Sequence, residues 1–175
     1  MGQQAEVMIV GGGPVGMGLA IELAQRGVHS IVLERHFVPQ PIPKGQNLTQ
    51  RTMEHFRHWG VEEAIRKASP IPVSFGIGGL TAYGTLLSPY HYDWYQRVIV
   101  RPFYVCDNER LPQYETEAAL RARAAELPLV TTFFGWTAQT ITQDADGVQV
   151  EAVSRDGETR ILRAQYLVGC DGAHS

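Results

Sequence analysis

The chain has 175 residues, which is the length of one domain with a substantial core. Its composition is that of a globular protein and its net charge is −3, so it lacks the basic surface that nucleic-acid binding needs. No apolar run reaches the length of a membrane span and no secretory leader is recognisable, which favours a cytoplasmic protein without a membrane partner. The two distant cysteines and the scattered histidines suggest neither a disulfide framework nor a metal site.

The first predicted element is a strand over residues 7–10, a continuous apolar run typical of a parallel strand covered on both faces. The run ends in GGGPVG, in which Gly11, Gly13 and Gly16 have the G-x-G-x-x-G spacing. In a dinucleotide-binding unit such glycines allow a tight turn, a close approach to pyrophosphate, and close packing of helix on strand. Pro14 suits the first turn of a helix, where no backbone donor is needed.

A helix is expected from Pro14 until Gly27. Its face toward the sheet is predicted to carry larger apolar residues and small ones, namely Val15, Leu19, Leu23, Gly18, Ala20 and Ala24. A second strand covers residues 30–33, and Glu34 follows at the position where an acid accepts hydrogen bonds from the adenosine ribose. A carboxylate there disfavours a 2′-phosphate, so the pattern predicts FAD or NAD in preference to NADP.

Alternate prolines exclude helix and central strand from residues 37–46 and predict an extended loop. Two helices should follow, one capped by Thr49 and stopped by Gly60, the other over residues 61–68. Residues 71–102 are rich in glycine, proline and aromatic residues and predict no regular arrangement. We favour core positions for these aromatic side chains over the lining of a pocket for an aromatic ligand.

Regular elements return with a helix between Pro112 and Pro128 and a strand over residues 129–133. Three strand-like runs follow, over residues 137–143, 148–153 and 159–162. Asp-Gly pairs separate them and predict an antiparallel meander. A last buried strand, residues 166–169, leads into CDGAHS. Because such a strand should feed a further element, we expect the sequence to be the N-terminal part of a longer polypeptide.

The glycine turn, the QRTME helix and the closing YLVGCDGAHS together resemble the single-component FAD-dependent aromatic hydroxylases, or class A flavoprotein monooxygenases. The resemblance covers nearly the whole sequence, and the turn combined with D-G-x-x-S after an apolar strand is specific. It implies an α/β fold, a Rossmann-like FAD-binding domain with a parallel sheet plus an antiparallel three-stranded β-meander. Residues 1–175 would be the N-terminal part of that domain, and an excursion of residues 71–102 into the substrate domain stays open.

The resemblance implies cofactor-binding roles for Gly11, Gly13, Pro14, Gly16, Glu34, Arg35, Lys44, Arg51, Gln113 and Asp171. Glu34 matches the ribose acid, and Arg35 matches the neighbour that faces the adenine end. Lys44 stands where the family has a basic residue, commonly arginine, that approaches flavin or NAD(P)H phosphates. Arg51 is a second candidate for that role, with an exposed helix face as its alternative.

Two residues in the second half of the sequence also match cofactor-binding residues of the family. Gln113 resembles a glutamine that contacts the ribityl region of the flavin at the head of a helix. Asp171 matches the aspartate of the D-G motif, which serves both flavin and reduced nicotinamide binding. The arginine that follows this motif in the family and a later G-D motif lie outside these residues.

By resemblance, the complete enzyme binds FAD, is reduced by NADPH or NADH, and hydroxylates a phenol ring with dioxygen through a flavin hydroperoxide. No side chain is assigned as a catalytic acid or base. The partners implied are an aromatic small molecule and dioxygen, and a homodimer is left open. The alternatives are an epoxidase or halogenase on the same scaffold, or a fragment that binds a dinucleotide without turnover. The meander and the D-G motif argue against an NAD-dependent dehydrogenase.

Overall fold

A computed structural model describes residues 3–70, 80–93 and 97–173. The chain forms two compact units, the first from residues 1–44 and 113–175, the second from residues 45–112. Among the helices of these described ranges, none is both long and apolar enough to cross a membrane.

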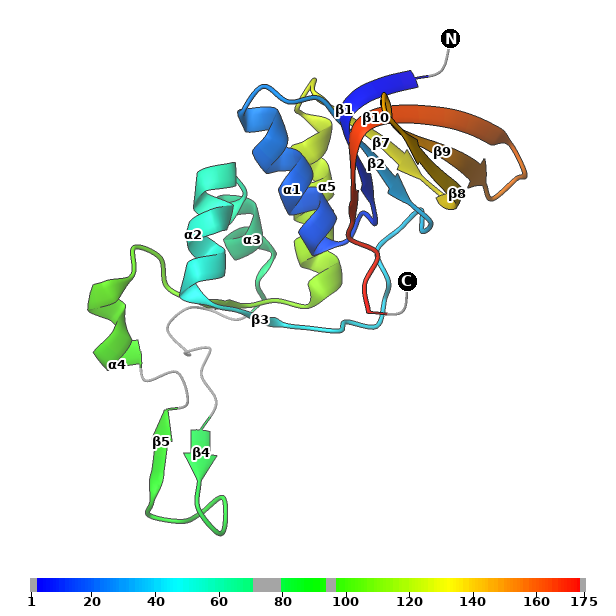
Figure 1. The fold of residues 1–175 in the computed structure, drawn as a ribbon. Coiled ribbons are helices and arrows are strands. Elements are labelled where there is room, and N and C mark those ends of the chain that lie inside the picture. The colour runs from blue at the N-terminus through cyan, green and yellow to red at the C-terminus, as the bar shows by residue number, and fades with distance from the viewer. Residues whose placement is uncertain (1–2, 71–79, 94–96, 174–175) are drawn as a thin grey trace. The chain divides into compact units, whose positions relative to one another are not determined.

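The first unit is built on a six-stranded sheet (Figure 1). Its strands are β1 (Gln3–Val10), β2 (Ser30–Glu34), β7 (Val130–Phe134), β8 (Trp136–Asp144), β9 (Gly147–Ser154) and β10 (Thr159–Gly169). The order is β7-β2-β1-β10-β9-β8, with the first four strands parallel and the last two pairings antiparallel. The predicted α/β fold with a parallel sheet and an antiparallel meander is confirmed.

Strand β10 corrects one detail of the prediction, because the two strands expected at residues 159–162 and 166–169 are one continuous element. Its first part pairs antiparallel with β9, while β10 also pairs in parallel with β1. Leu162 and Ala164 are buried, whereas Arg163 and Gln165 between and after them are exposed. The polar residues therefore alternate along one strand and do not mark a break.

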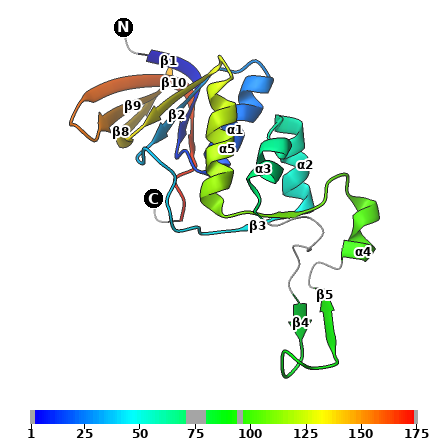
Figure 2. The same ribbon diagram turned by 180° about the vertical axis from the view of Figure 1, so that it is seen from behind.

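Two helices lie side by side along one face of this sheet, as both ribbon views show (Figures 1 and 2). They are α1 (Pro14–Gln25) and α5 (Gln113–Ala125). The predicted inner face of α1 was wrong in part, since Val15 is 72% exposed. The predicted small residues Gly18 and Ala20 are buried, and Gly16, Met17 and Ile21 are buried with them. Small residues on this face let the helix approach the strands closely.

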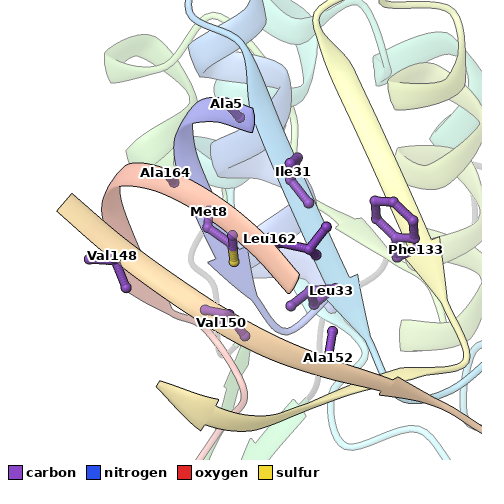
Figure 3. Packing of buried hydrophobic residues seen from close by; sticks show 10 residues of the cluster. All are labelled: Ala5, Met8, Ile31, Leu33, Phe133, Val148, Val150, Ala152, Leu162 and Ala164. Carbon is purple, nitrogen blue, oxygen red and sulfur yellow. The ribbon is translucent and has the colours of Figure 1, made fainter. Parts of the chain in front are cut away.

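A hydrophobic cluster of the core lies on the opposite face of the parallel strands, beneath the curled meander (Figure 3). Because side chains alternate along a strand, Met8 points away from the face on which Ile9 approaches Gly16. Apolar side chains from both parts of the sheet meet there: Ala5, Met8, Ile31, Leu33, Phe133, Val148, Val150, Ala152, Leu162 and Ala164. This packing fixes the strand ends from which the candidate site is built.

The second unit contains the two predicted helices and several short elements. Its elements are β3 (Asn47–Leu48), α2 (Gln50–Trp59), α3 (Glu62–Ala68), β4 (Leu80–Ala82), β5 (His91–Asp93), α4 (Arg97–Val100), the 3-10 helix η2 (Arg101–Phe103) and β6 (Glu109–Arg110). Strands β3 and β6 pair antiparallel, as do β4 and β5.

Among the aromatic residues of 71–102 that the structure describes, Tyr83, Tyr90 and Tyr92 depart from the core positions that we favoured. Tyr83 and Tyr90, on either side of the β4–β5 hairpin turn, are 81% and 68% exposed. A two-stranded hairpin has no second layer of its own to cover these rings. Trp94 and Tyr95 lie outside the described residues.

Helix α2 offers a direct test of local capping. The hydroxyl of Thr49 accepts a hydrogen bond of 3.3 Å from the backbone N–H of Thr52, and Gly60 ends the helix at φ 75°. We expect Thr49→Ala to lower the free energy of unfolding by about 1 kcal/mol, measured by denaturant unfolding. Thr49→Ser keeps the hydroxyl and should remain close to the unmodified protein; equal stability of the two variants would contradict the capping role.

Candidate dinucleotide site

A cavity of about 340 Å³ lies in the first unit, where the carboxyl ends of β1, β2 and β10 meet. This is the edge at which open α/β sheets bind their ligands. Eight of the ten predicted residues line it: Gly11, Gly13, Pro14, Glu34, Arg35, Lys44, Gln113 and Asp171. The remaining two, Gly16 and Arg51, are not part of the lining.

The glycine turn is shaped by close backbone approaches at two of its positions. Gly11 has φ 108°, donates its N–H to the carbonyl of Leu33 at 2.8 Å, and has no room for a Cβ beside the backbone of Cys170. A Cβ on Gly16 would overlap the carbonyl oxygen of Gly11. The roles of these two glycines in turn geometry and helix packing are therefore visible directly.

Gly13 differs from Gly11 and Gly16, because a Cβ added at Gly13 would meet no atom within 4 Å. It lies at the N-cap of α1, with Pro14 at the first helical position. The first N–H groups of a helix lack partners within the helix and favour an anion. Open space at this helix terminus fits the approach of a pyrophosphate group.

Glu34 is nearly buried, at 9% exposure, and its carboxylate is already held in place. One oxygen accepts a hydrogen bond of 2.7 Å from the N–H of Gly12, and the other accepts one of 2.8 Å from the N–H of His36. A carboxylate has about four acceptor sites, so capacity remains for ribose hydroxyls.

The middle glycine of the GGG run has a structural role that the motif does not specify. A Cβ on Gly12 would lie 2.7 Å from the Cβ of Glu34. Gly12 thus makes room for the acid whose carboxylate its own N–H binds. The only signal in the sequence was the run of three glycines.

Helix α5 contributes two cavity residues that were not predicted, Glu117 and Arg121, in addition to Gln113. The amide Nε2 of Gln113 donates to Glu117 at 2.7 Å. Arg121 donates to the carbonyl of Phe37 at 2.9 Å, and its guanidinium lies 4.3 Å from the ring centroid of Phe134. Spacing by four residues along a helix was the signal available in the sequence.

Burial and charge act in opposite directions on Arg121. Partial burial lowers the pKa of its guanidinium, while the carboxylates of Glu34 and Glu117 raise that pKa. The reference pKa of arginine is so high that the side chain keeps its charge. The site therefore places one arginine close to two poorly exposed acids.

The end of β10 closes the cavity beside the glycine turn. The N–H of Cys170 donates to the carbonyl of Val10 at 2.6 Å, and Cys170 and Asp171 both line the cavity. Burial raises the pKa of the Cys170 thiol, and the charge of Asp171 raises it further. Cys170 is therefore a neutral thiol at neutral pH, which gives no reason to assign it as a nucleophile.

Arg51 is located on α2, in the second unit. Its side chain is 70% exposed and pairs with Glu54 at 3.0 Å. Its exposure and this ion pair favour the exposed-helix-face alternative considered from the sequence. Lys44 is thus the one of the two basic candidates that contributes to the cavity.

The fold and the cavity define the chain as a dinucleotide-binding α/β protein of the Rossmann type. A family model described as an FAD binding domain matches residues 4–175. The chain therefore belongs to this FAD-binding domain family, as the resemblance predicted.

Named relatives agree with this assignment. The chain is 34% identical to an FAD-dependent monooxygenase of Emericella nidulans, over 97% of this chain and 29% of the relative. It is 30% identical to a phenol 2-monooxygenase of Pseudomonas sp., over 98% of this chain and 29% of the relative. The crystal structure of the flavin-dependent monooxygenase PieE with FAD and substrate superposes with a TM-score of 0.85 at 27% identity, covering 98% of this chain and 31% of PieE. The chain thus spans less than a third of the length of these relatives.

Proposed function

We propose that this chain forms the adenosine- and pyrophosphate-binding part of an FAD-dependent monooxygenase. Such an enzyme would use NADH or NADPH and dioxygen to hydroxylate an aromatic, phenolic substrate. The observation that carries the proposal is the convergence of the glycine turn, Glu34, Gln113 and Asp171 on one cavity. These residues are far apart in the sequence, and a plain turn or a solvated helix face would not require them to meet.

The residue roles follow from chemistry and position. Gly11, Gly13 and Pro14 would surround the pyrophosphate at the N-terminus of α1, where donors and the helix dipole favour negative charge. Glu34 would accept from the adenosine ribose, with Arg35 at the adenine end. Gly16 would not contact the cofactor, but it allows α1 to pack closely on the glycine turn.

The remaining residues would hold the other parts of the cofactor. Lys44 would place a point charge near phosphate, Gln113 would contact the ribityl chain, and Asp171 would lie on the flavin side. When bound, the flavin supplies the redox chemistry that links reduced nicotinamide, dioxygen and the aromatic ring. The protein binds and orients it, and we propose that residues 71–102 extend toward the substrate domain.

Exposed apolar residues at the cavity also support a ligand with flat rings. Val15, Val38 and Ile42 line the cavity and are 72%, 69% and 79% exposed. Covering such side chains with an aromatic ring removes apolar surface from water. An adenine or flavin ring fits this requirement, whereas a simple sugar phosphate offers no comparable surface.

The cofactor assignment is tested by titrating FAD into the purified 175-residue chain and following flavin fluorescence. We expect saturable binding that ADP competes away, and weaker competition by 2′-phosphorylated ADP because Glu34 disfavours a second anion at the ribose. A chain that is folded by circular dichroism but leaves flavin fluorescence unchanged would contradict the proposal.

Hydroxylation is tested with the natural protein that contains this domain, purified from the cells that produce it. Oxidation of NADH or NADPH should accelerate when a phenol is added, and the product should be heavier by one oxygen atom. Nicotinamide oxidation that is indifferent to every phenol tried, with no oxygenated product, would contradict the reaction while leaving FAD binding intact.

A further inference from the structure

Three polar side chains of α5 share one face of the helix and the same cavity. Gln113, Glu117 and Arg121 are spaced at four-residue intervals, and all three line the dinucleotide site. Leu120 and Ala124 of the same helix are completely buried. The polar series is therefore a distinct stripe of α5 that faces the cavity.

Glu117 determines which atoms Gln113 can offer to a ligand. The Nε2 of Gln113 donates to the carboxylate of Glu117 at 2.7 Å, and Glu117 is only 7% exposed. A carboxylate only accepts hydrogen bonds, so the amide of Gln113 must turn its nitrogen toward Glu117. The carbonyl oxygen of Gln113 and its second N–H are then left for the ligand.

Arg121, at the other end of the stripe, lies near enough to Glu34 and Glu117 for both carboxylates to raise the pKa of its guanidinium. Its guanidinium is held by the carbonyl of Phe37 at 2.9 Å and by the ring of Phe134. The position of Arg121 is thus set by contacts other than Glu117. A carboxylate supported by this fixed charge can hold the amide of Gln113 in one orientation.

We propose that Glu117 is a positioning residue that orients the Gln113 amide to recognise a chain of hydroxyl groups, such as the ribityl chain of FAD. Hydroxyls both donate and accept, so they match a carbonyl oxygen and an N–H presented together. A deprotonated phosphate cannot donate to that oxygen and is repelled by Glu117. This inference rests on the proposed cofactor and specifies which part of it α5 selects.

Glu117→Gln is the principal test, because it keeps the size of the side chain and removes the constraint on the partner amide. We expect FAD affinity to fall about 3- to 10-fold, as for the loss of one ordinary hydrogen bond. ADP lacks the ribityl chain, so it should bind the variant at least as tightly as the unmodified chain. A merely structural role of Glu117 would weaken FAD and ADP alike, and that result would overturn the proposal.

Three companion variants test whether Glu117 acts through Gln113. Gln113→Leu should also weaken FAD and spare ADP, and the double variant should lose no more than the larger single loss, since both changes remove one interaction. Glu115→Gln is the matched control on the same helix, outside the cavity lining, and should bind FAD normally. Additive losses in the double variant would show that Glu117 does not act through Gln113.

A readout without cofactor separates this inference from the proposed function. In the free chain, one Nε2 proton of Gln113 should resonate downfield in the nitrogen-correlated NMR spectrum, because it donates to a charged acceptor. Glu117→Gln should move it toward the ordinary amide position. If the unmodified chain binds no FAD, the proposed function fails, whereas an unmoved resonance overturns the orienting role of Glu117 itself.

Discussion

Replacing Glu34 by alanine is expected to weaken FAD binding about 10- to 150-fold. The carboxylate is held at the end of β2 by the N–H groups of Gly12 and His36, at 2.7 Å and 2.8 Å, and keeps acceptor capacity for a ribose. Losing a hydrogen bond to a charged group costs about 1.5–3 kcal/mol, which corresponds to that change in affinity. The measurement is a fluorescence titration with FAD.

The same substitution removes the acceptor of two backbone N–H groups, so stability must be followed beside affinity. Denaturant unfolding of the Glu34→Ala variant measures the folding free energy lost when the N–H groups of Gly12 and His36 lose their acceptor. The FAD titration is then made under conditions in which the variant is folded. Glu126→Ala, at a side chain that is 65% exposed beyond the end of α5, is the matched control and should leave FAD binding unchanged. Unchanged affinity in the folded Glu34 variant would remove this acid from the site.

The elements that the sequence predicted correctly are those whose signals are local. Thr49 and Gly60 bound α2 because a hydroxyl cap and a left-handed glycine act on neighbouring backbone groups. The Asp-Gly pairs likewise specified the meander, since they fix a turn between adjacent strands. Such features need no information from distant parts of the chain.

The errors concern burial, which depends on what a segment packs against. Val15 has the hydrophobicity of a core residue, but it lies at the first turn of α1 and lines the cavity, so it is exposed. Two strands were expected at residues 159–162 and 166–169, although Arg163 and Gln165 between them are the outward residues of one continuous strand, β10. To predict either feature correctly, one must know where the neighbouring sheet or cavity lies, and the periodicity of apolar residues does not give that position.

The candidate site shows the same division. The spacing of the glycine motif and the strand-end position of Glu34 could be recognised because they lie within one supersecondary unit. The glycine run and the four-residue spacing pointed to Gly12 and Glu117, but their roles depend on contacts with Glu34 and Gln113 that only side-chain placement reveals. Arg51 stayed ambiguous in the sequence, and its exposure and pairing with Glu54 favour the helix-surface interpretation.

The second large effect is expected from alanine substitutions in the glycine turn. We expect a loss of stability at Gly11 and a loss of FAD binding at Gly13. Gly11→Ala should cost about 3 kcal/mol or more of folding stability. Its φ of 108° is unfavourable for a residue with a side chain, and the added Cβ would press on the backbone of Cys170 and lie 2.6 Å from the nitrogen of Asp171. Backbone atoms of two strand ends cannot move away independently, so the turn and β10 would have to separate.

Gly13→Ala should instead preserve the fold and damage binding. Its φ of −75° suits any residue, and no atom lies within 4 Å of the added Cβ, so the stability change should not exceed about 1 kcal/mol. The methyl group would, however, occupy space at the helix terminus where a pyrophosphate would approach, and overpacking of about 1–3 kcal/mol corresponds to roughly 5- to 150-fold weaker FAD binding. Unfolding curves and FAD titrations of both variants test this contrast. A Gly13→Ala variant that binds FAD normally would place the pyrophosphate elsewhere in the cavity, and a Gly11→Ala variant of unchanged stability would contradict the close contact between the turn and β10.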